Sequence, residues 1–346
     1  MSKIAPIPNS LVTSSLVAIV MLAFVSCASS PSTHLPGPST RVYPPAPALA
    51  RLAYVQTIRV PADMGLKPSA WSRMNSWITG RGGSAPVLEK PFGLALDDAT
   101  NLCLTDMDSA SVCYFDLTHG SFHRWNKIGE VVLQSPEAVA KRKDVFYVAD
   151  SKLGLVLAFD SAGHLLCSIS NQLARPAGLA VSSDRLYVAD SQLHHIVVFD
   201  LSGQYLFQFG RRGLAPGEFN FPTHIAVAPN GQILVTDSMN GRVEVFDSKG
   251  AFQSVIGGPG ESSGHFSRPK GVACDSLVHI YVVDALFDNF QIFDSAGQLL
   301  LDVGSTGAEA GEFCLPAGIV ISSDNRIFVA DTYNHRVQVF KYIGPP

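Results

Sequence analysis

The chain has 346 residues, of which 47% are hydrophobic and 16% are charged, and its formal net charge is −4. This composition can fill a sizeable core, so it excludes a chain that is disordered throughout. With 25 basic and 29 acidic residues, the chain has no excess of positive charge to hold a phosphate backbone. A nucleic-acid-binding protein is therefore not expected.

The first 26 residues have the features of a signal peptide. The apolar run from Leu11 to Val25 is too short to span a bilayer comfortably and has the length of a signal-peptide hydrophobic region. It ends at Ser26-Cys27, and a small residue before a cysteine resembles the lipobox of bacterial lipoproteins. The resemblance implies lipidation at Cys27 and anchoring of an exported protein to a membrane. In such lipoproteins an aspartate at the position of Ser29 retains the protein at the inner membrane, so the serine favours the outer membrane. The alternative to lipidation is an ordinary signal peptide that is followed by a cysteine by chance.

Residues 27–50 contain closely spaced prolines and small polar residues without apolar periodicity. Such a stretch cannot bury enough surface to fold, so we predict an extended tether. The predicted domains are a signal peptide over residues 1–26, a tether over 27–50 and one folded domain over 51–346.

The folded domain contains six repeats. Each opens with a proline, and the prolines follow one another at intervals of 40 to 47 residues. The opening prolines are Pro91, Pro136, Pro176, Pro222, Pro269 and Pro316. Each repeat reads as four short strands with hairpin turn pairs such as Asn230-Gly231, and no helical pattern separates them. The repeat length and strand content predict an all-β protein, a six-bladed β-propeller.

The sixth repeat stops after its third strand, whereas residues 52–59 form an unpartnered strand-like segment before the first repeat. We predict that this segment supplies the outer strand of the sixth blade and so closes the ring. Residues 62–89 then form an insertion before the first inner strand. Within it, Trp71, Met74 and Ile78 have helical spacing, which predicts one short helix over residues 68–79.

Two segments carry the repeat signature most completely. They are ILVTDSMNGRVEVF, from Ile233 to Phe246, and IFVADTYNHRVQVF, from Ile327 to Phe340. Both resemble the NHL repeat, and the resemblance extends in weaker form over residues 52–340. It implies a six-bladed propeller that binds proteins, peptides or RNA. Related propellers include lyases and hydrolases, so the resemblance alone does not decide the function.

An aspartate closes the second strand of every repeat, and we expect these residues to cap turns rather than to form a catalytic cluster. They are Asp106, Asp150, Asp190, Asp237, Asp284 and Asp331. Arg242 and Arg336 are expected to pair with these carboxylates or with backbone carbonyls. Cys103 and Cys113 precede two aspartates on consecutive antiparallel strands, so a disulfide between them is a candidate, with two free thiols as the alternative.

The sequence lacks the spaced histidines of a zinc site and the motifs of hydrolases, metalloproteases and phosphate-binding loops. We therefore expect no metal, no cofactor and no catalytic residue. His224 is notable because it lies two residues after an opening proline, where the other repeats have Gly or Ala.

The predicted function is that of a non-catalytic, membrane-anchored binding or scaffolding propeller of the bacterial cell envelope, with a monomeric domain. A protein or peptide would bind the face that carries the loops leading into the inner strands. The alternative is a cell-envelope lyase or lactonase-like hydrolase that uses the mouth of the central channel. The candidate binding residues are Trp71, Phe92, Glu137, His224, Met239, Lys270, Phe287 and Tyr333.

Overall fold

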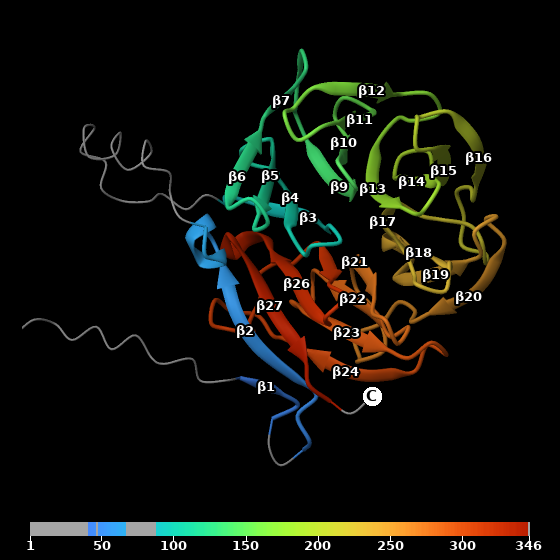
Figure 1. Ribbon diagram of the computed structural model, residues 1–346. Coiled ribbons are helices and arrows are strands. Elements are labelled where there is room, and N and C mark those ends of the chain that lie inside the picture. Colours follow the sequence, from blue (N-terminus) through green and yellow to red (C-terminus); the bar gives the residue numbers. More distant parts are fainter. Residues whose placement is uncertain (1–40, 46–47, 67–87, 345–346) are drawn as a thin grey trace, which may run out of the picture. The chain divides into compact units, whose positions relative to one another are not determined.

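The computed structural model describes residues 41–45, 48–66 and 88–344. Within them, six antiparallel sheets surround a common axis as the blades of a propeller (Figure 1). The six-bladed all-β fold expected from the repeats is confirmed. The described residues contain only short 3₁₀ turns as helical elements: η1 (Pro61–Met64), η2 (Ser238–Asn240) and η3 (Thr332–Asn334).

Blades 1 to 5 each consist of four consecutive strands, with the first strand innermost. Blade 1 contains β3 (Pro91–Leu96), β4 (Leu102–Asp106), β5 (Ser111–Asp116) and β6 (Ser121–Trp125). Blade 2 contains β9 (Pro136–Arg142), β10 (Val145–Asp150), β11 (Leu155–Phe159) and β12 (Leu165–Ile169). Blade 3 contains β13 (Pro176–Val181), β14 (Arg185–Asp190), β15 (His195–Asp200) and β16 (Tyr205–Phe209).

Blade 4 contains β17 (Pro222–Val227), β18 (Ile233–Asp237), β19 (Arg242–Phe246) and β20 (Phe252–Ile256). Blade 5 contains β21 (Pro269–Cys274), β22 (Ile280–Asp284), β23 (Asn289–Phe293) and β24 (Leu299–Val303). A small hairpin, β7 (Lys127–Ile128) with β8 (Val131–Val132), lies in the connection between blades 1 and 2.

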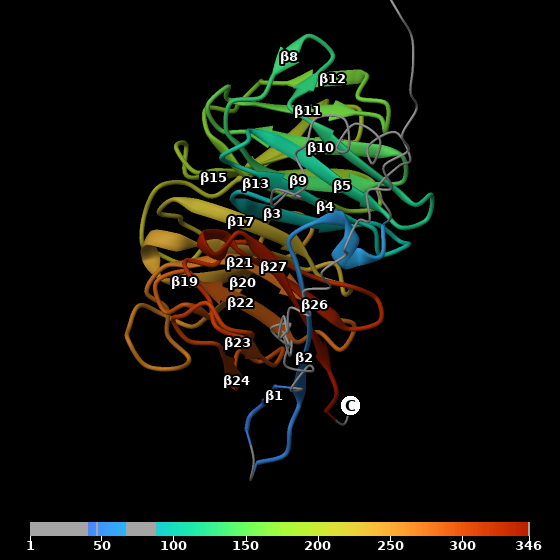
Figure 2. The ribbon, with the colours of Figure 1, turned by 90° about the vertical axis from the view of Figure 1, so that its left-hand side faces the viewer.

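The two ends of the described residues meet in blade 6. Its inner strands are β25 (Ile319–Ile321), β26 (Arg326–Asp331) and β27 (Arg336–Tyr342), and its outer strand is β2 (Leu52–Ile58). Strand β2 pairs antiparallel with β27, with Ile58 opposite Val337, and the two strands run side by side in Figure 2. The predicted closure by residues 52–59 is therefore confirmed, and it pairs an edge of β27 that would otherwise be exposed.

A fifth strand, β1 (Val42–Tyr43), extends this blade and differs from the sequence prediction. Val42 pairs with Ala53, and the Tyr43 hydroxyl donates a hydrogen bond to the Gly311 carbonyl at 3.3 Å. Residues 42–43 thus belong to the sheet of blade 6, whereas the sequence analysis assigned them to the tether. Two residues are too few to show strand alternation in a sequence, and this strand forms through its contacts with blade 6.

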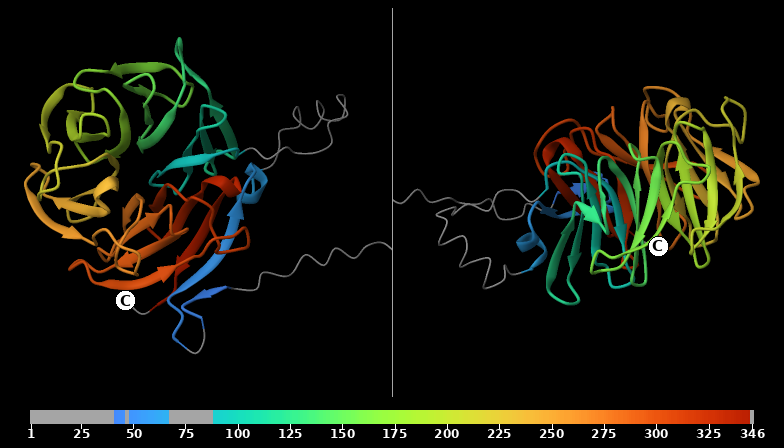
Figure 3. Two further views of the ribbon diagram at one scale, coloured as in Figure 1. Left: turned by 180° about the vertical axis from the view of Figure 1, so that it is seen from behind. Right: turned by 90° about the horizontal axis from the view of Figure 1, so that it is seen from above.

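The hydrophobic core is divided into six layers, each between two neighbouring blades. Figure 3 shows the ring from behind and from above. Near the axis the layers become thin. A Cβ atom added to Gly93 would lie 2.6 Å from the Glu137 carbonyl oxygen of blade 2, and one added to Gly178 would lie 2.7 Å from that of Thr223 in blade 4. Glycine at these positions therefore allows the inner strands of neighbouring blades to approach each other.

The candidate disulfide between Cys103 and Cys113 is not formed, and the alternative of two free thiols holds. Cys103 lies opposite Tyr114, and Leu104 lies opposite Cys113, so the two cysteines are one position out of register. Neighbouring residues of a strand project to opposite faces. Cys103 consequently packs between blades 1 and 2 and Cys113 between blades 6 and 1, and both are buried free thiols.

Five predictions lie wholly or partly outside the described residues: the signal peptide over residues 1–26, lipidation at Cys27, the tether over residues 27–50, the helix over residues 68–79, and the binding role of Trp71. Over the part of the protein that is described, no helix has the length and hydropathy needed to cross a membrane.

Candidate functional site

The six closing aspartates connect two sets of loops. Asp150, for example, is fully buried and accepts hydrogen bonds from the backbone N–H groups of Gln134 at 2.6 Å and Leu153 at 3.0 Å. Gln134 precedes the inner strand of blade 2, and Leu153 lies between its second and third strands. Both sets of loops therefore lie on one face of the ring, which we call the Asp face, and the aspartates are structural capping residues.

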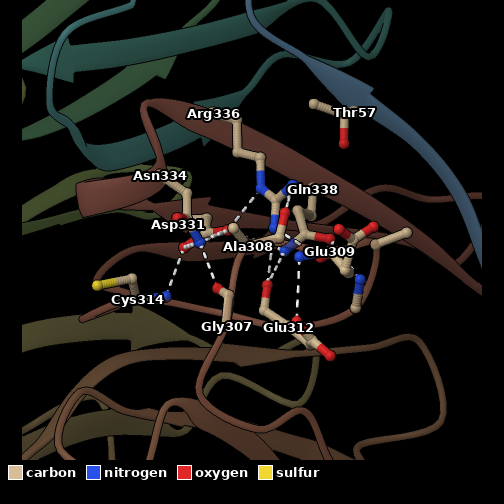
Figure 4. A network of polar contacts seen from close by, with 12 residues as sticks. Thr57, Gly307, Ala308, Glu309, Glu312, Cys314, Asp331, Asn334, Arg336 and Gln338 are labelled. Carbon is tan, nitrogen blue, oxygen red and sulfur yellow. Dashed lines mark hydrogen bonds and ion pairs between the residues drawn. The ribbon is translucent and has the colours of Figure 1, made fainter.

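Arg336 fixes another part of this face (Figure 4). Its Nε donates to the Asp331 carboxylate at 2.6 Å, and its two terminal nitrogens donate to the carbonyl oxygens of Ala308, Glu309 and Glu312. Arg242 makes the equivalent contacts in blade 4, with Asp237 at 3.0 Å. The carbonyl acceptors belong to the glycine-rich segment that leads from the preceding blade into the blade of the arginine, which we call the connector. Each arginine thus stabilises its connector, so its role is structural.

The axis of the propeller contains a cavity of about 40 Å³, which is lined by the inner strands. His224 lines it, and within the described residues neither of its buried ring nitrogens has a hydrogen-bond partner. Burial, with a smaller effect from the Lys270 charge, lowers the pKa of His224 from 6.5 to about 3. The imidazole is therefore neutral at physiological pH. The volume of the cavity is also far below the roughly 300 Å³ of an ordinary small-molecule site.

Four predicted binding residues meet at the mouth of this channel. The ring of Phe92 in blade 1 lies 5.8 Å from that of His224 in blade 4, and Lys270 Nζ of blade 5 lies 5.5 Å from the centre of the Phe92 ring. Glu137 of blade 2 acts electrostatically on Lys270. Arg175, which the sequence analysis did not single out, contacts the Glu137 carboxylate at 3.4 Å.

The other predicted residues lie further out, on the loops of the Asp face. Met239 and Tyr333 are 50% and 51% exposed, whereas Phe287 is partly buried and its neighbour Leu286 is 54% exposed. Met239, Leu286 and Tyr333 belong to a set of exposed apolar residues on blades 3 to 6, which we call the apolar crescent. Its members are Leu193, Phe221, Met239, Leu286, Leu315 and Tyr333. The residues equivalent to Met239 in blades 1, 2 and 3 are Asp108, Lys152 and Gln192, and Leu193 of blade 3 lies one position further on.

Two members of the apolar crescent, Phe221 and Leu315, were missed from the sequence, and both have a left-handed backbone. Their φ angles are 56° and 46°, a conformation that costs a bulky residue on the order of 1–2 kcal/mol. Each is held from the preceding blade: the Phe221 N–H donates to His194 Nδ1 at 3.1 Å, and the Leu315 N–H donates to the Asp288 carboxylate at 2.7 Å. The exposed side chains are therefore held on well-defined backbone.

Within the described ranges, no three His, Cys, Asp or Glu side chains are grouped so that they could hold a metal ion. The polar groups of the Asp face instead stabilise loops, and its exposed surface combines apolar side chains with a small cluster of charges at the channel mouth.

Comparison with known families supports the repeat assignment. The NHL repeat matches residues 219–246 and 313–340, and a family described as a 6-bladed beta-propeller matches residues 164–232. No curated protein matches the sequence.

Many solved structures share the fold. A streptogramin B lyase structure is 10% identical, and the match covers 75% of this protein and 96% of the lyase with a TM-score of 0.55. Hydrazine synthase of Kuenenia stuttgartiensis is 14% identical, with a TM-score of 0.53 over 75% of this protein and 97% of the synthase. The WD40 beta propeller domain of Doa1 is 14% identical, with a TM-score of 0.55 over 72% of this protein and 78% of that domain. Such low identities indicate the fold alone, and together with the family matches they lead to one conclusion: this protein is a six-bladed β-propeller that carries NHL repeats.

Proposed function

We propose that this protein is a non-catalytic binding propeller that contacts a protein or peptide through its Asp face. The observation that carries the proposal is the apolar crescent, in which six exposed apolar side chains occupy the loops of four consecutive blades. Several exposed apolar side chains gathered on the loops of one face are typical of an interaction site.

The way in which the crescent is held also supports binding. Phe221 and Leu315 have strained backbone that neighbouring blades stabilise through hydrogen bonds. Fixing an apolar side chain before the partner arrives lowers the entropy that binding costs. Aromatic and large aliphatic side chains such as Phe221, Met239 and Tyr333 are also the kinds of residue that anchor protein interfaces.

We do not propose the alternative of an envelope lyase or hydrolase. The axial cavity of about 40 Å³ holds no more than a few water molecules. His224, the histidine beside it, has a pKa near 3, which is poorly suited to proton transfer at neutral pH.

We further propose that the propeller is tethered to a membrane of the bacterial cell envelope, with the outer membrane favoured, through a lipid on Cys27. The support is the apolar run before Cys27 and the proline-rich residues after it. Replacing Cys27 with Ser and fractionating the cells tests the anchor, and a variant that partitions with membranes like the wild type would show that Cys27 carries no lipid anchor.

Blade 5 offers a matched pair of variants for the binding face. Leu286 on the Asp face is 54% exposed, and Leu277 in a hairpin on the opposite face is 46% exposed. Leu286→Ser should reduce the recovery of proteins that co-purify with the solubilised protein, whereas Leu277→Ser should not. Circular dichroism would verify that both variants fold, and equal recovery with the two variants would contradict the assignment of the Asp face.

A further inference from the structure

Lys270 at the channel mouth has an unusual environment for a lysine. It is the first residue after the opening proline of blade 5, it is only partly exposed, and its ammonium group lies over the Phe92 ring. Among the described residues, no hydrogen bond or ion pair involves this ammonium group. Burial lowers the pKa of Lys270, Glu137 opposes this effect, and the charges of Arg268 and Arg175 add to it.

The nearby carboxylate of Glu137 does not neutralise Lys270 directly. Glu137 is buried, and its Oε1 accepts a hydrogen bond from the Ser151 hydroxyl at 2.6 Å and a longer one from Arg175 at 3.4 Å. The carboxylate is therefore engaged with blades 2 and 3. Lys270 is left with a Coulomb interaction with Glu137 and the face of the Phe92 ring.

The channel mouth consequently has a local excess of positive charge. The charges of Arg175 and Arg268 act on Lys270 there, and Glu137 is the acidic group that does so. This contrasts with the protein as a whole, whose net charge is −4. An apolar residue would pack against Phe92 without the cost of partly desolvating an ammonium group, so the lysine is not explained by packing alone.

We propose that the channel mouth binds a carboxylate group of the peptide or protein partner, which accepts a hydrogen bond from Lys270 and is attracted by the charge of Arg268. This inference rests on the proposed binding function and specifies the chemistry of its ligand. A single negative charge fits better than a doubly charged phosphate, because the Glu137 carboxylate also acts on Lys270 and would repel a second negative charge more strongly. The mouth and the apolar crescent share the Asp face, so one ligand can combine a carboxylate with apolar side chains.

Two groups of a peptide supply such a carboxylate: its C-terminus and the side chain of an Asp or Glu residue. Three short probes distinguish them. The first is acetyl-Leu-Leu with a free carboxylate, the second is its C-terminal amide, and the third is acetyl-Leu-Asp amide. Their dissociation constants for the full-length protein would be measured by calorimetric titration at low ionic strength.

At least one of the two carboxylate probes should bind about tenfold more tightly than the neutral amide, as a charge-assisted hydrogen bond would give. Lys270→Met, which keeps an unbranched side chain over Phe92, should abolish that preference. Arg268→Gln, a change at an exposed position, should reduce it and provides a second variant should Lys270→Met fail to fold. Lys249→Met, at an exposed hairpin on the opposite face, is the control and should preserve the preference.

Equal binding of all three probes, or a preference that survives both mouth variants, would overturn the carboxylate inference. If Leu286→Ser still lowers partner recovery in that case, the proposed binding face stands and only the ligand chemistry is wrong. If the carboxylate preference is present while Leu286→Ser has no effect, the mouth is a carboxylate site and the apolar crescent is not the partner surface.

Discussion

The backbone N–H of Phe221 donates a hydrogen bond to Nδ1 of His194 at 3.1 Å, across the boundary between blades 3 and 4. The two rings also meet edge to face, with 5.0 Å between their centres. In the same way, the Asp288 carboxylate of blade 5 receives the N–H of Leu315 before blade 6. Each contact joins neighbouring blades at their loops and holds an exposed apolar side chain of the crescent in place.

The first prediction concerns this link between blades. His194→Ala removes the acceptor of the Phe221 N–H and should lower the free energy of unfolding by about 1 kcal/mol. It should also weaken partner recovery, because Phe221 loses its fixed orientation. Chemical denaturation and co-purification measure the two effects. His164→Ala, at an exposed turn on the opposite face, is the control, and equal effects of the two variants would count against the link.

The second prediction concerns Glu244, which is buried in blade 4 where blades 5 and 6 have Gln291 and Gln338. All three side chains accept the N–H of a connector glycine, but only the glutamines also donate an Nε2–H to a connector carbonyl. Burial raises the pKa of Glu244 from 4.5 to about 7, despite the opposing charge of Arg242.

Because this pKa is raised in the folded state, folding takes up a proton between pH 4.5 and 7. The free energy of unfolding should therefore fall as the pH rises through this window and level off above it. Glu244→Gln should be more stable than the wild type at pH 8, by on the order of 2–3 kcal/mol, and similar to it near pH 4.5. Denaturant titrations across this range measure the difference. A Glu244→Gln variant that keeps the full wild-type pH dependence of stability would contradict the prediction. A weaker pH dependence is expected to remain in the variant, because burial also raises the pKa of Asp237.

The third prediction concerns ring closure. Removal of residues 28–59 deletes β2 and with it the fully buried side chains of Leu52 and Ile58. This should lower the free energy of unfolding by at least roughly 4 kcal/mol, as expected for the loss of two large core residues. Removal of residues 28–40 alone leaves β1 and β2 in place and should have little effect. Thermal melts compare the two truncations, and coincident melting temperatures would show that β2 does not close the ring.

The fourth prediction tests the close approach of the inner strands. Gly93→Ala should destabilise the propeller by about 1–3 kcal/mol, since the added methyl group would overlap the Glu137 carbonyl oxygen and push blades 1 and 2 apart. Gly258 provides the control, because a Cβ atom there has no neighbour within 4 Å. Gly258→Ala should change the stability little. A Gly93→Ala variant with the melting temperature of the wild type would mean that the inner strands can accommodate the added methyl group without moving apart.

The sequence alone determined the number of blades and the way the ring closes. Both follow from patterns that are local or repeated: turn pairs, alternating strands, opening prolines and a sixth repeat that lacks its outer strand. The capping role of the aspartates was also predictable, since an aspartate that recurs in every repeat serves the architecture shared by all of them.

Other features were decided only by the tertiary structure. The sequence left open whether Cys103 and Cys113 form a disulfide, because the spacing of cysteines does not reveal strand register. A shift of one residue in strand pairing sends the two side chains to opposite faces of the sheet. Phe221 and Leu315 escaped notice because left-handed backbone at a non-glycine residue depends on an acceptor from another blade.

The channel mouth is the clearest case. Phe92 and His224 are far apart in the sequence and come from blades 1 and 4, yet their rings lie 5.8 Å apart, and Lys270 of blade 5 lies against Phe92. The sequence identified these residues one at a time, as exceptions within their repeats. Only the closure of six sheets around one axis brings them together, because the first residues of the inner strands then converge at a single opening, where their charges and rings act on each other.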